Sequence, residues 1–239
     1  MKTDNNQVSR WILPKPINEE EIEHCTLNYT LQKVLIRRGI DLNNELEDYL
    51  TPTQLPNPED HFNDLEKASQ RIIEACSRKE IIAICGDYDA DGITSTVLLI
   101  ELLSKLGAKV EPFIPSRQDE GYGLNISMIN RIHDKQIKLI ITVDNGISSI
   151  EAIKKSSDLG IDLIVTDHHK IPDIKLNIFS LIHPERTPIN SPYKYLAGVG
   201  IAYLLAKNIC NKLNYDINKT TANVFFSIGT VADMAPLKG

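Results

Sequence analysis

An apolar run passes directly into three alternating aspartates in the stretch Ile81-Ile82-Ala83-Ile84-Cys85-Gly86-Asp87-Tyr88-Asp89-Ala90-Asp91-Gly92. The apolar half has the composition of a buried strand, and the two glycines let the backbone turn tightly around the acids. Three carboxylates held this close repel one another unless a cation offsets their charge. The stretch therefore predicts a metal site at the end of a strand, with Asp87, Asp89 and Asp91 as candidate ligands.

Two other interpretations of this stretch are a solvated acidic turn and a calcium loop of the EF-hand type. The EF-hand is disfavoured, because loop position twelve, counted from Asp87, is Leu98 instead of the bidentate glutamate that such a loop requires. The solvated turn stays open for this patch taken alone.

Three further patches of acidic or histidine residues follow apolar, strand-like runs. They are Asp144-Asn145-Gly146, Asp167-His168-His169 and Ala232-Asp233-Met234, and the runs before them cover residues 138–143, 163–166 and 225–231. In an open α/β sheet, ligands gather outside the carboxyl ends of the strands. We therefore expect the four patches to converge and to supply the ligands of a pair of divalent metal ions.

The two patches with a single acid have plainer interpretations when each is taken alone. Asp144 precedes an Asn-Gly turn pair and could be a turn or cap residue, while Ser148 and Ser149 could cap the next helix. Asp233 could be a capping aspartate before a turn that ends in proline. Only the joint occurrence of all four patches makes coincidence an unattractive explanation.

The two neighbouring histidines could also be ordinary surface residues. Imidazole and carboxylate ligands suit Mn²⁺, Fe²⁺ or Zn²⁺, and adjacent side chains diverge, so His168 or His169 could bind metal while the other faces a substrate. Asp167 could orient one of the rings through its second nitrogen. Because the pair follows an apolar strand at the same sheet edge as the acids, we favour the metal site.

The regular part of the chain alternates helices with strands. We expect helices at 94–106, 126–135, 149–159 and 198–213, and strands at 81–85, 109–114, 138–143, 162–166 and 178–182. The strands are continuously apolar, as a sheet covered on both faces requires. This pattern predicts a doubly wound, mostly parallel α/β domain over 63–239. Residues 1–62 are rich in proline around expected helices at 27–38 and 43–50, and predict a helical or irregular lead-in arm.

Composition limits the class of protein without deciding it. The 239 residues are 42% apolar, enough for a sizeable core, and the net charge of −6 argues against bulk attraction to nucleic acid. Several acids belong to the proposed site, however, and two divalent cations would offset four of these negative charges. The four cysteines lie far apart, which predicts reduced thiols. Without a leader or an apolar run of ~18 residues, we expect a cytoplasmic protein with no membrane partner.

The four patches together resemble the successive motifs of the DHH phosphoesterase family. Three other segments are similar to the branch of that family made up of single-strand-specific DNA exonucleases: Ile114-Pro115-Ser116-Arg117, Glu120-Gly121-Tyr122-Gly123-Leu124 and Leu196-Ala197-Gly198-Val199-Gly200-Ile201-Ala202. The lead-in is also similar, in Arg38-Gly39-Ile40 and in Asn57-Pro58. The resemblance covers nearly the whole chain.

The resemblance implies a role for each acid and histidine of the site. Asp89 and Asp144 would hold one metal, and Asp144 would bridge to a second metal held also by Asp91, His168 and Asp233. Asp87 would be an additional ligand or an acid outside the ligand shell, and His169 would contact the scissile phosphate. Mn²⁺ is the first choice for a mixture of carboxylates and imidazole, and Mg²⁺ is the alternative.

Further residues are candidates for binding the substrate. Arg117 could pair with a backbone phosphate, and Tyr122 could offer a stacking face to a base. Residues Gly198 and Gly200 are expected to open a helix whose amide end can receive an anion. The alternatives are an exposed arginine, a packed tyrosine and, for the glycines, close helix packing.

The resemblance implies a metal-dependent exonuclease that degrades single-stranded DNA from 5′ to 3′ in repair and recombination, with a single-strand-binding protein and a helicase as possible partners. Such proteins carry a second domain that closes over the cleft, and this sequence lacks one, so we expect a truncated chain or a fragment with weak processive activity. Alternatives are a phosphoesterase for short oligonucleotides, nucleoside bisphosphates or cyclic dinucleotides, and a non-catalytic scaffold. Intact acids at all four patches disfavour the scaffold.

Overall fold

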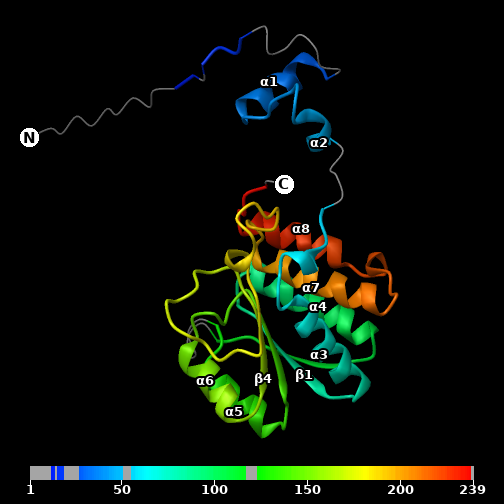
Figure 1. The fold of residues 1–239 in the computed structure, drawn as a ribbon, viewed down its shortest axis with the longest axis vertical. Helices are drawn as coiled ribbons and strands as arrows, with labels where there is room; N and C mark the ends of the chain where they lie inside the picture. The colour runs from blue at the N-terminus through cyan, green and yellow to red at the C-terminus, as the bar shows by residue number, and fades with distance from the viewer. Residues whose placement is uncertain (1–11, 14, 19–26, 51–54, 117–122, 238–239) are drawn as a thin grey trace, which may run out of the picture. The chain divides into compact units, whose positions relative to one another are not determined.

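The computed structural model describes residues 12–13, 15–18, 27–50, 55–116 and 123–237, and the chain divides into two compact units, Met1–Gln54 and Leu55–Gly239 (Figure 1). The first unit contains helices α1 (Tyr29–Arg37) and α2 (Leu46–Leu50), where two helices were predicted. Asn28 begins α1 by accepting a hydrogen bond from the Leu31 amide at 2.9 Å. The proposed domain boundary near residue 63 stays a prediction.

The second unit is built on a five-stranded sheet in the order β2-β1-β3-β4-β5, with every neighbouring pair parallel. The strands are β1 (Ile81–Cys85), β2 (Lys109–Phe113), β3 (Leu139–Val143), β4 (Asp162–Thr166) and β5 (Ser180–Ile182). All five residues of β3, the central strand, are buried, which explains the unbroken apolar runs in the sequence. The doubly wound parallel fold that was predicted is confirmed.

Helices cover both faces of this sheet (Figure 1). One face carries α3 (Leu65–Ser77), α4 (Ala90–Lys105), α7 (Gly198–Lys212) and α8 (Ala222–Ala232), and the other carries α5 (Ile126–Asp134) and α6 (Ile150–Asp158). Short 3₁₀ helices occur at η2 (Pro58–Asp60), η3 (Pro184–Arg186) and η4 (Ile217–Lys219). Alternate strand residues serve the two cores: Ile82 and Ile84 face the first, and Ala83 and Cys85 face the second.

The chain leaves β1 toward β2 on one side and then returns to place β3 on the other side of β1. The strand order therefore reverses between β1 and β3, and the carboxyl ends of these two strands flank the reversal point. Crevices of this kind are the usual ligand sites of open α/β sheets. The loops that begin at Gly86 and Asp144 both start there.

Two local predictions were wrong. Residues 225–231 are not a strand-like run: they lie in α8, which packs against α4 and α7. Their aromatic and β-branched side chains favoured a strand, but an unbroken apolar run is equally typical of a helix packed on several neighbours. Asp91 is not in an irregular turn either, because α4 begins at Ala90 and Asp91 belongs to its first turn.

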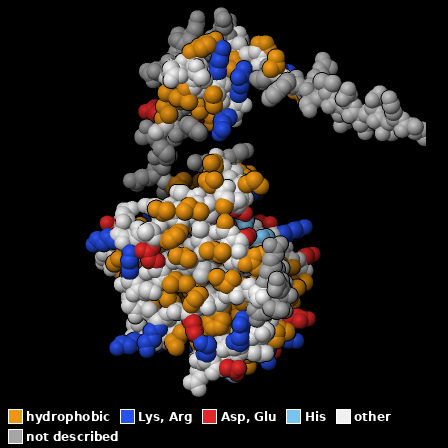
Figure 2. All heavy atoms as spheres, turned by 180° about the vertical axis from the view of Figure 1, so that it is seen from behind, with side chains coloured by type: hydrophobic (Ala, Val, Ile, Leu, Met, Phe, Trp, Pro, Cys, Tyr) orange, Lys and Arg blue, Asp and Glu red, His pale blue; other side chains and the backbone are white. Residues whose placement is uncertain are grey.

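The surface of the second unit keeps many apolar side chains in contact with solvent, as the orange areas in Figure 2 show. On α8 and just after it, the exposed ones are Val224, Ile228, Val231 and Met234. Within the described residues, every helix falls short of the length and hydrophobicity that a membrane-spanning helix requires.

Candidate metal centre

The structure brings all four patches together. Three groups of side chains place one potential ligand atom each within 4.8 Å of one another: Asp87 with Asp89 and Asp144, Asp91 with His168 and Asp233, and Asp144 with His168 and His169. Asp144 and His168 each belong to two groups, so the three groups form one continuous cluster. The predicted convergence of the four patches is confirmed.

The first two aspartates leave β1 on a tight turn into α4. Asp87 is fully buried, and its carboxylate accepts a hydrogen bond from the Tyr88 amide at 2.7 Å. Asp89 is the N-cap of α4 and accepts a bond from the Gly92 amide at 2.8 Å. A side chain at Gly92 would place its Cβ 2.7 Å from the backbone nitrogen of Asp87. Glycine is therefore needed here for the close approach of the helix to the acidic turn.

Asp144 lies at the centre of the cluster with a left-handed backbone, φ 59°. Its side chain is almost completely buried, and Oδ1 lies 3.1 Å from His168 Nε2. Burial raises the pKa of Asp144 to about 8, and the nearby carboxylates of Asp91 and Asp89 add to the rise, although His168 opposes it. A non-glycine residue in this backbone region costs energy, and such positions are concentrated at functional sites.

Asp91 receives two amide hydrogen bonds from the start of α7. The Gly198 amide donates to one carboxylate oxygen at 2.6 Å, and the Val199 amide donates to the other at 2.7 Å. Burial nevertheless raises the pKa of Asp91, because it outweighs these two bonds. The helix start that was expected to receive an anion therefore receives a carboxylate of the chain itself.

The two glycines at the start of α7 serve close packing in the structure. A Cβ at Gly198 would lie 2.6 Å from the Asp144 Cβ, and a Cβ at Gly200 would lie 2.9 Å from Leu196 Cδ2. Gly198 thus lets the N-terminal end of α7 approach both Asp91 and Asp144. The alternative of close helix packing, weighed for these glycines from the sequence, describes this geometry.

The rings of the two histidines after β4 do not diverge as expected: their centroids lie 4.7 Å apart, and both belong to one group of potential ligands with Asp144. Their hydrogen-bond partners nevertheless differ. His168 lies between Asp144 and Asp91, at 3.1 and 3.8 Å, while His169 Nδ1 lies 2.8 Å from Asp167 Oδ1. Burial lowers the pKa of His168, but the bond to Asp144 and the charge of Asp144 outweigh it, so the net shift is upward. The hydrogen bond to Asp167 raises the pKa of His169 to about 9.

Asp167 is the buried carboxylate that orients the second histidine. Its Oδ1 also accepts the His169 amide at 3.0 Å, and its Oδ2 accepts the Ile147 amide at 2.9 Å. Burial would raise the pKa of Asp167, yet these bonds to the carboxylate outweigh burial and the pKa falls. Asp167 is therefore a charged anchor that fixes the tautomer and direction of the His169 ring.

Asp233 reaches the cluster from the C-terminal end of α8. It is the C-cap residue of that helix and is partly exposed. The position of α8 depends on Gly229, where a Cβ would lie 2.4 Å from Thr94 Oγ1 and 2.8 Å from Val199 Cγ1. This close approach to α4 and α7 brings Asp233 within reach of Asp91 and His168.

Two residues that the sequence did not single out hold the loops of the cluster. Asn145 was interpreted as half of a turn pair, but its buried amide bonds to two distant segments as well as to the end of its own strand. His183 is fully buried, its Nε2 lies 2.6 Å from the His169 carbonyl oxygen, and its Nδ1 accepts the Glu185 amide at 3.1 Å. An amide bonded to Nδ1 leaves the proton on Nε2, so His183 donates to the loop that carries His169.

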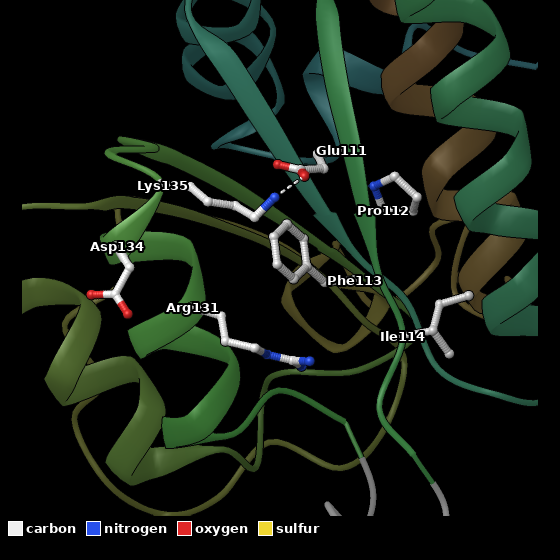
Figure 3. A pocket seen from close by; sticks show the side chains of 7 residues that line it. All are labelled: Glu111, Pro112, Phe113, Ile114, Arg131, Asp134 and Lys135. Atoms are coloured by element: carbon white, nitrogen blue, oxygen red, sulfur yellow. Dashed lines mark hydrogen bonds and ion pairs between the residues drawn. The ribbon is translucent and has the colours of Figure 1, made fainter.

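A hollow of about 470 Å³ beside β2 is separate from the cluster of acids and histidines. It is lined by Glu111, Pro112, Phe113, Ile114, Arg131, Asp134 and Lys135 (Figure 3). Within it Lys135 pairs with Glu111, so its acid and base offset each other. None of the clustered acids lines this hollow. The predicted substrate residues Arg117 and Tyr122 lie outside the described residues.

The donor chemistry of the cluster fits divalent cations. Carboxylates and a single type of nitrogen ligand suit Mn²⁺, and the carboxylates alone suit Mg²⁺. Buried acids that raise one another's pKa mark a place where positive charge would be stabilising. Asp87, Asp89 and Asp144 could surround one ion, and Asp91, His168 and Asp233 a second.

A doubly wound α/β sheet with carboxylates and histidines gathered at its reversal point defines an α/β domain with a candidate site for divalent metal ions. Residues 81–228 match the model of the DHH family, N-terminal domain, and the chain belongs to this family. The resemblance seen in the four motifs is thereby confirmed.

Several relatives share most of the chain. The single-stranded-DNA-specific exonuclease RecJ of Bacillus subtilis (strain 168) is 35% identical over 95% of this chain and 29% of its own length. The RecJ of Haemophilus influenzae is 32% identical over 93% of this chain and 39% of its own length. The chain thus spans about a third of the length of the curated relatives it matches.

Solved structures support the same fold. Exonuclease RecJ bound to manganese superposes with a TM-score of 0.69 at 34% identity, covering 79% of this chain and 46% of that one. RecJ in complex with Mn²⁺ from Thermus thermophilus gives 0.69 at 30% identity, covering 87% of this chain and 29% of that one. A Mg²⁺ complex from the same organism gives 0.56 at 28% identity, covering 87% of this chain and 25% of that one.

Proposed function

We propose that this chain carries the catalytic centre of a metal-dependent hydrolase that cleaves phosphodiester bonds in single-stranded DNA from the 5′ end. One observation carries the proposal: the Asp144 carboxylate is shared between two groups of potential ligands, as a ligand that bridges two adjacent cations requires. The names of the relatives support DNA as the substrate.

The ligand roles are assigned from the geometry and the family resemblance. Asp144 would lie between the two ions, with Asp89 on one side and with Asp91, His168 and Asp233 on the other. Asp87, left open as a ligand in the sequence, belongs to the group of Asp89 and Asp144 and is assigned to the first ion. When bound, two such ions would lower the pKa of a water and stabilise the charge that develops on the phosphate.

The residues around the ions have their own tasks. His169 Nδ1 is held by Asp167, which leaves Nε2 of the ring to contact a phosphate oxygen. Asp167 holds that ring in one direction. The start of α7 and the Gly92 turn approach the acids so closely that a Cβ at Gly198 would lie 2.6 Å from Asp144 Cβ and a Cβ at Gly92 would lie 2.7 Å from Asp87 Cβ.

Single-stranded DNA labelled at either end, incubated with Mn²⁺, tests the activity. We expect release of short products from the 5′ end, slower cleavage of duplex DNA, and little cleavage of short RNA. Preferential hydrolysis of short RNA, nucleoside bisphosphates or cyclic dinucleotides would instead assign a different substrate to the same centre. No hydrolysis of any phosphoester with Mn²⁺ or Mg²⁺ would contradict the proposal.

Asp144→Ala is the variant that tests the bridging role. It should abolish hydrolysis, because loss of a shared carboxylate releases both ions, and substantial residual turnover would refute the assignment.

Action in repair and recombination, and cooperation with a single-strand-binding protein and a helicase, belong to the same proposal. Binding of the chain to each of these proteins, measured separately, tests them.

A further inference from the structure

The side chain of Asn145 makes hydrogen bonds to three separate segments of the chain. Its Nδ2 donates to the Cys85 carbonyl at 3.1 Å and to the Val143 carbonyl at 2.8 Å, and its Oδ1 accepts the Leu124 amide at 3.1 Å. The residue is 1% exposed, so water cannot replace these bonds. Both donors of the amide and one lone pair of its oxygen are used.

Two of these contacts join the strands on either side of the reversal point. Cys85 is the last residue of β1 and Val143 is the last residue of β3. The backbone pairing of these strands ends at the Cys85 and Thr142 pair. The Asn145 amide therefore continues the connection between β1 and β3 one step beyond the last paired residues.

The acids of the cluster leave the sheet at this point. Asp87 follows Cys85 by two residues, and Asp144 lies between Val143 and Asn145. The spacing of these two carboxylates thus depends on the spacing of the two strand ends that one amide holds. Asp144 has its left-handed backbone at this position, φ 59°, which turns the chain so that the next side chain can point back between the strands.

The third contact reaches the start of α5. Leu124 is buried, and the next residue, Asn125, caps α5 by accepting the Met128 amide at 2.9 Å. Gly123 has φ 67°, and a Cβ there would lie 3.2 Å from the Asn145 Cβ. The segment 123–125 is therefore closely fitted to Asn145 on one side and to α5 on the other.

We infer that Asn145 is a positioning residue that sets the distance between the metal-binding loops of β1 and β3 and fixes segment 123–125 to them. Only an amide supplies two donors and one acceptor in this plane. A carboxylate would face two carbonyl oxygens with acceptors, and an aliphatic side chain would remove all three hydrogen bonds from a buried place. This inference rests on the proposed metal centre.

Mn²⁺ titration of Asn145→Ala by calorimetry tests the first half of the inference. Residues outside the ligand shell that orient metal ligands change affinity by about 10- to 100-fold, and we expect a loss in that range. The inference would be overturned if the wild type binds Mn²⁺ and folded Asn145→Ala binds it with an affinity within about twofold of the wild type. That result would leave the proposed function standing.

Asn208→Ala is the matched control. Asn208 is also a buried amide, 7% exposed, and its Nδ2 donates to Ser69 Oγ at 2.9 Å between α7 and α3. Its loss should lower stability without changing Mn²⁺ affinity. A loss of affinity equal to that of Asn145→Ala would show that general destabilisation explains both, and would overturn the positioning role.

Hydrogen exchange in the absence of metal tests the second half. The Leu124 amide should exchange slowly in the wild type and at least about tenfold faster in Asn145→Ala, because its acceptor is removed. Gly123→Ala reaches the same contact from the other side, through its crowding of Asn145, and should also accelerate this exchange if Asn145→Ala fails to fold. Slow Leu124 exchange in both variants, or fast exchange in the wild type, would overturn the inference even if the wild type binds no metal.

Discussion

Charged side chains are arranged differently at the amino ends and at the carboxyl ends of the strands. At the amino ends of the strands, Arg71 on α3 places Nε 2.7 Å from Asp162 and a terminal nitrogen 2.7 Å from Glu80. At the carboxyl ends, aspartates lie close to one another and to two histidines. Hydrogen bonds and charge from the two acids raise the pKa of Arg71 despite burial, whereas burial raises the pKa of Asp144.

This difference separates a region whose charges are balanced within the chain from a region whose negative charges would be balanced by bound cations. The amino end balances positive with negative charge within the chain. The carboxyl end accumulates negative charge, and its acids become proton-bound more easily when no cation is present. The amino end is therefore expected to contribute to stability and the carboxyl end to function, and four predictions test or refine that division.

Asp144→Asn should have the largest effect. Asparagine tolerates the left-handed backbone, so the change removes only charge and a ligand oxygen. Hydrolysis of single-stranded DNA with Mn²⁺ should fall by more than about 100-fold. Unfolding in urea with EDTA should show equal or greater stability, because a buried carboxyl group whose pKa is raised on folding destabilises the folded state at neutral pH, and asparagine does not. A clear loss of metal-free stability would mean that the carboxyl end is also part of the scaffold.

The wild type and Asp144→Asn also provide a control for Mn²⁺ binding, through the effect of Mn²⁺ on the free energy of unfolding. At a Mn²⁺ concentration of one hundred times Kd, a site present only in the folded state adds about 2.7 kcal/mol to the free energy of unfolding. The wild type should gain on this scale when Mn²⁺ replaces EDTA, and Asp144→Asn should gain much less. Equal gains would place the metal elsewhere.

Arg71→Met should produce the opposite result. It leaves the carboxylates of Glu80 and Asp162 without their common partner, and the Arg71 side chain is 11% exposed. We expect a loss of about 1–3 kcal/mol in urea unfolding, between the values for exposed and buried pairs. Mn²⁺ affinity should be unchanged. Arg71→Lys is the control, and should recover only part of the loss because an ammonium group cannot form the same paired geometry.

Backbone strain gives a third test of the division. Lys79 and Gln136 have positive φ, 58° and 59°, just after α3 and α5, where glycine ends helices with less strain. Lys79→Gly and Gln136→Gly should each stabilise the protein by about 0.5–1 kcal/mol without affecting hydrolysis. Asp144→Gly relaxes the same conformation and should abolish hydrolysis. A loss of stability in either helix-end variant would show that its side chain has a role that outweighs the strain.

Sequence patterns were sufficient for the sheet and for the convergence of the candidate ligands that follow strands. Buried parallel strands must be apolar throughout, and their carboxyl ends must lie at one edge, so Asp87, Asp144 and His168 could be brought together without coordinates. Asp233 was singled out as a candidate ligand on the basis of the wrong element. Residues 225–231 were described as a strand-like run, because a short apolar run has no period that distinguishes a strand from a helix packed on several neighbours.

The residues that hold the site could not be found in the same way. Asn145 bonds to Cys85, 60 positions away, and to Leu124, 21 positions away, whereas its local pattern is that of a turn. His183 lies 14 positions from the carbonyl to which it donates. Such contacts exist only after the strands have paired, so a local signal in the sequence gives no indication of them.

The smallest expected effect concerns the start of α8. Helix α8 carries the candidate ligand Asp233 at its C-terminal end, and the prediction tests whether contacts at its N-terminal end anchor the helix to the scaffold. Glu101 on α4 accepts the Thr221 amide at 3.1 Å and is paired with Lys105. Burial would raise the pKa of Glu101, but the bonds from Lys105 and Thr221 outweigh it and hold the pKa below 4.5. The carboxylate therefore adds stability that is complete above pH 4.5 and is lost as the pH falls through the lower, folded-state value.

Glu101→Gln keeps an acceptor for Thr221 but removes the charge. We expect it to lower the free energy of unfolding by less than about 1 kcal/mol at pH 7, since solvent screens this pair. The difference from the wild type should shrink as the pH is lowered from 5 toward 3, because the wild-type carboxylate then takes up a proton. Hydrolysis at pH 7 should stay close to that of the wild type. A large loss of hydrolysis with little loss of stability would mean that the position of Asp233 depends on this distant anchor, and that the scaffold and the site are not separate along α8.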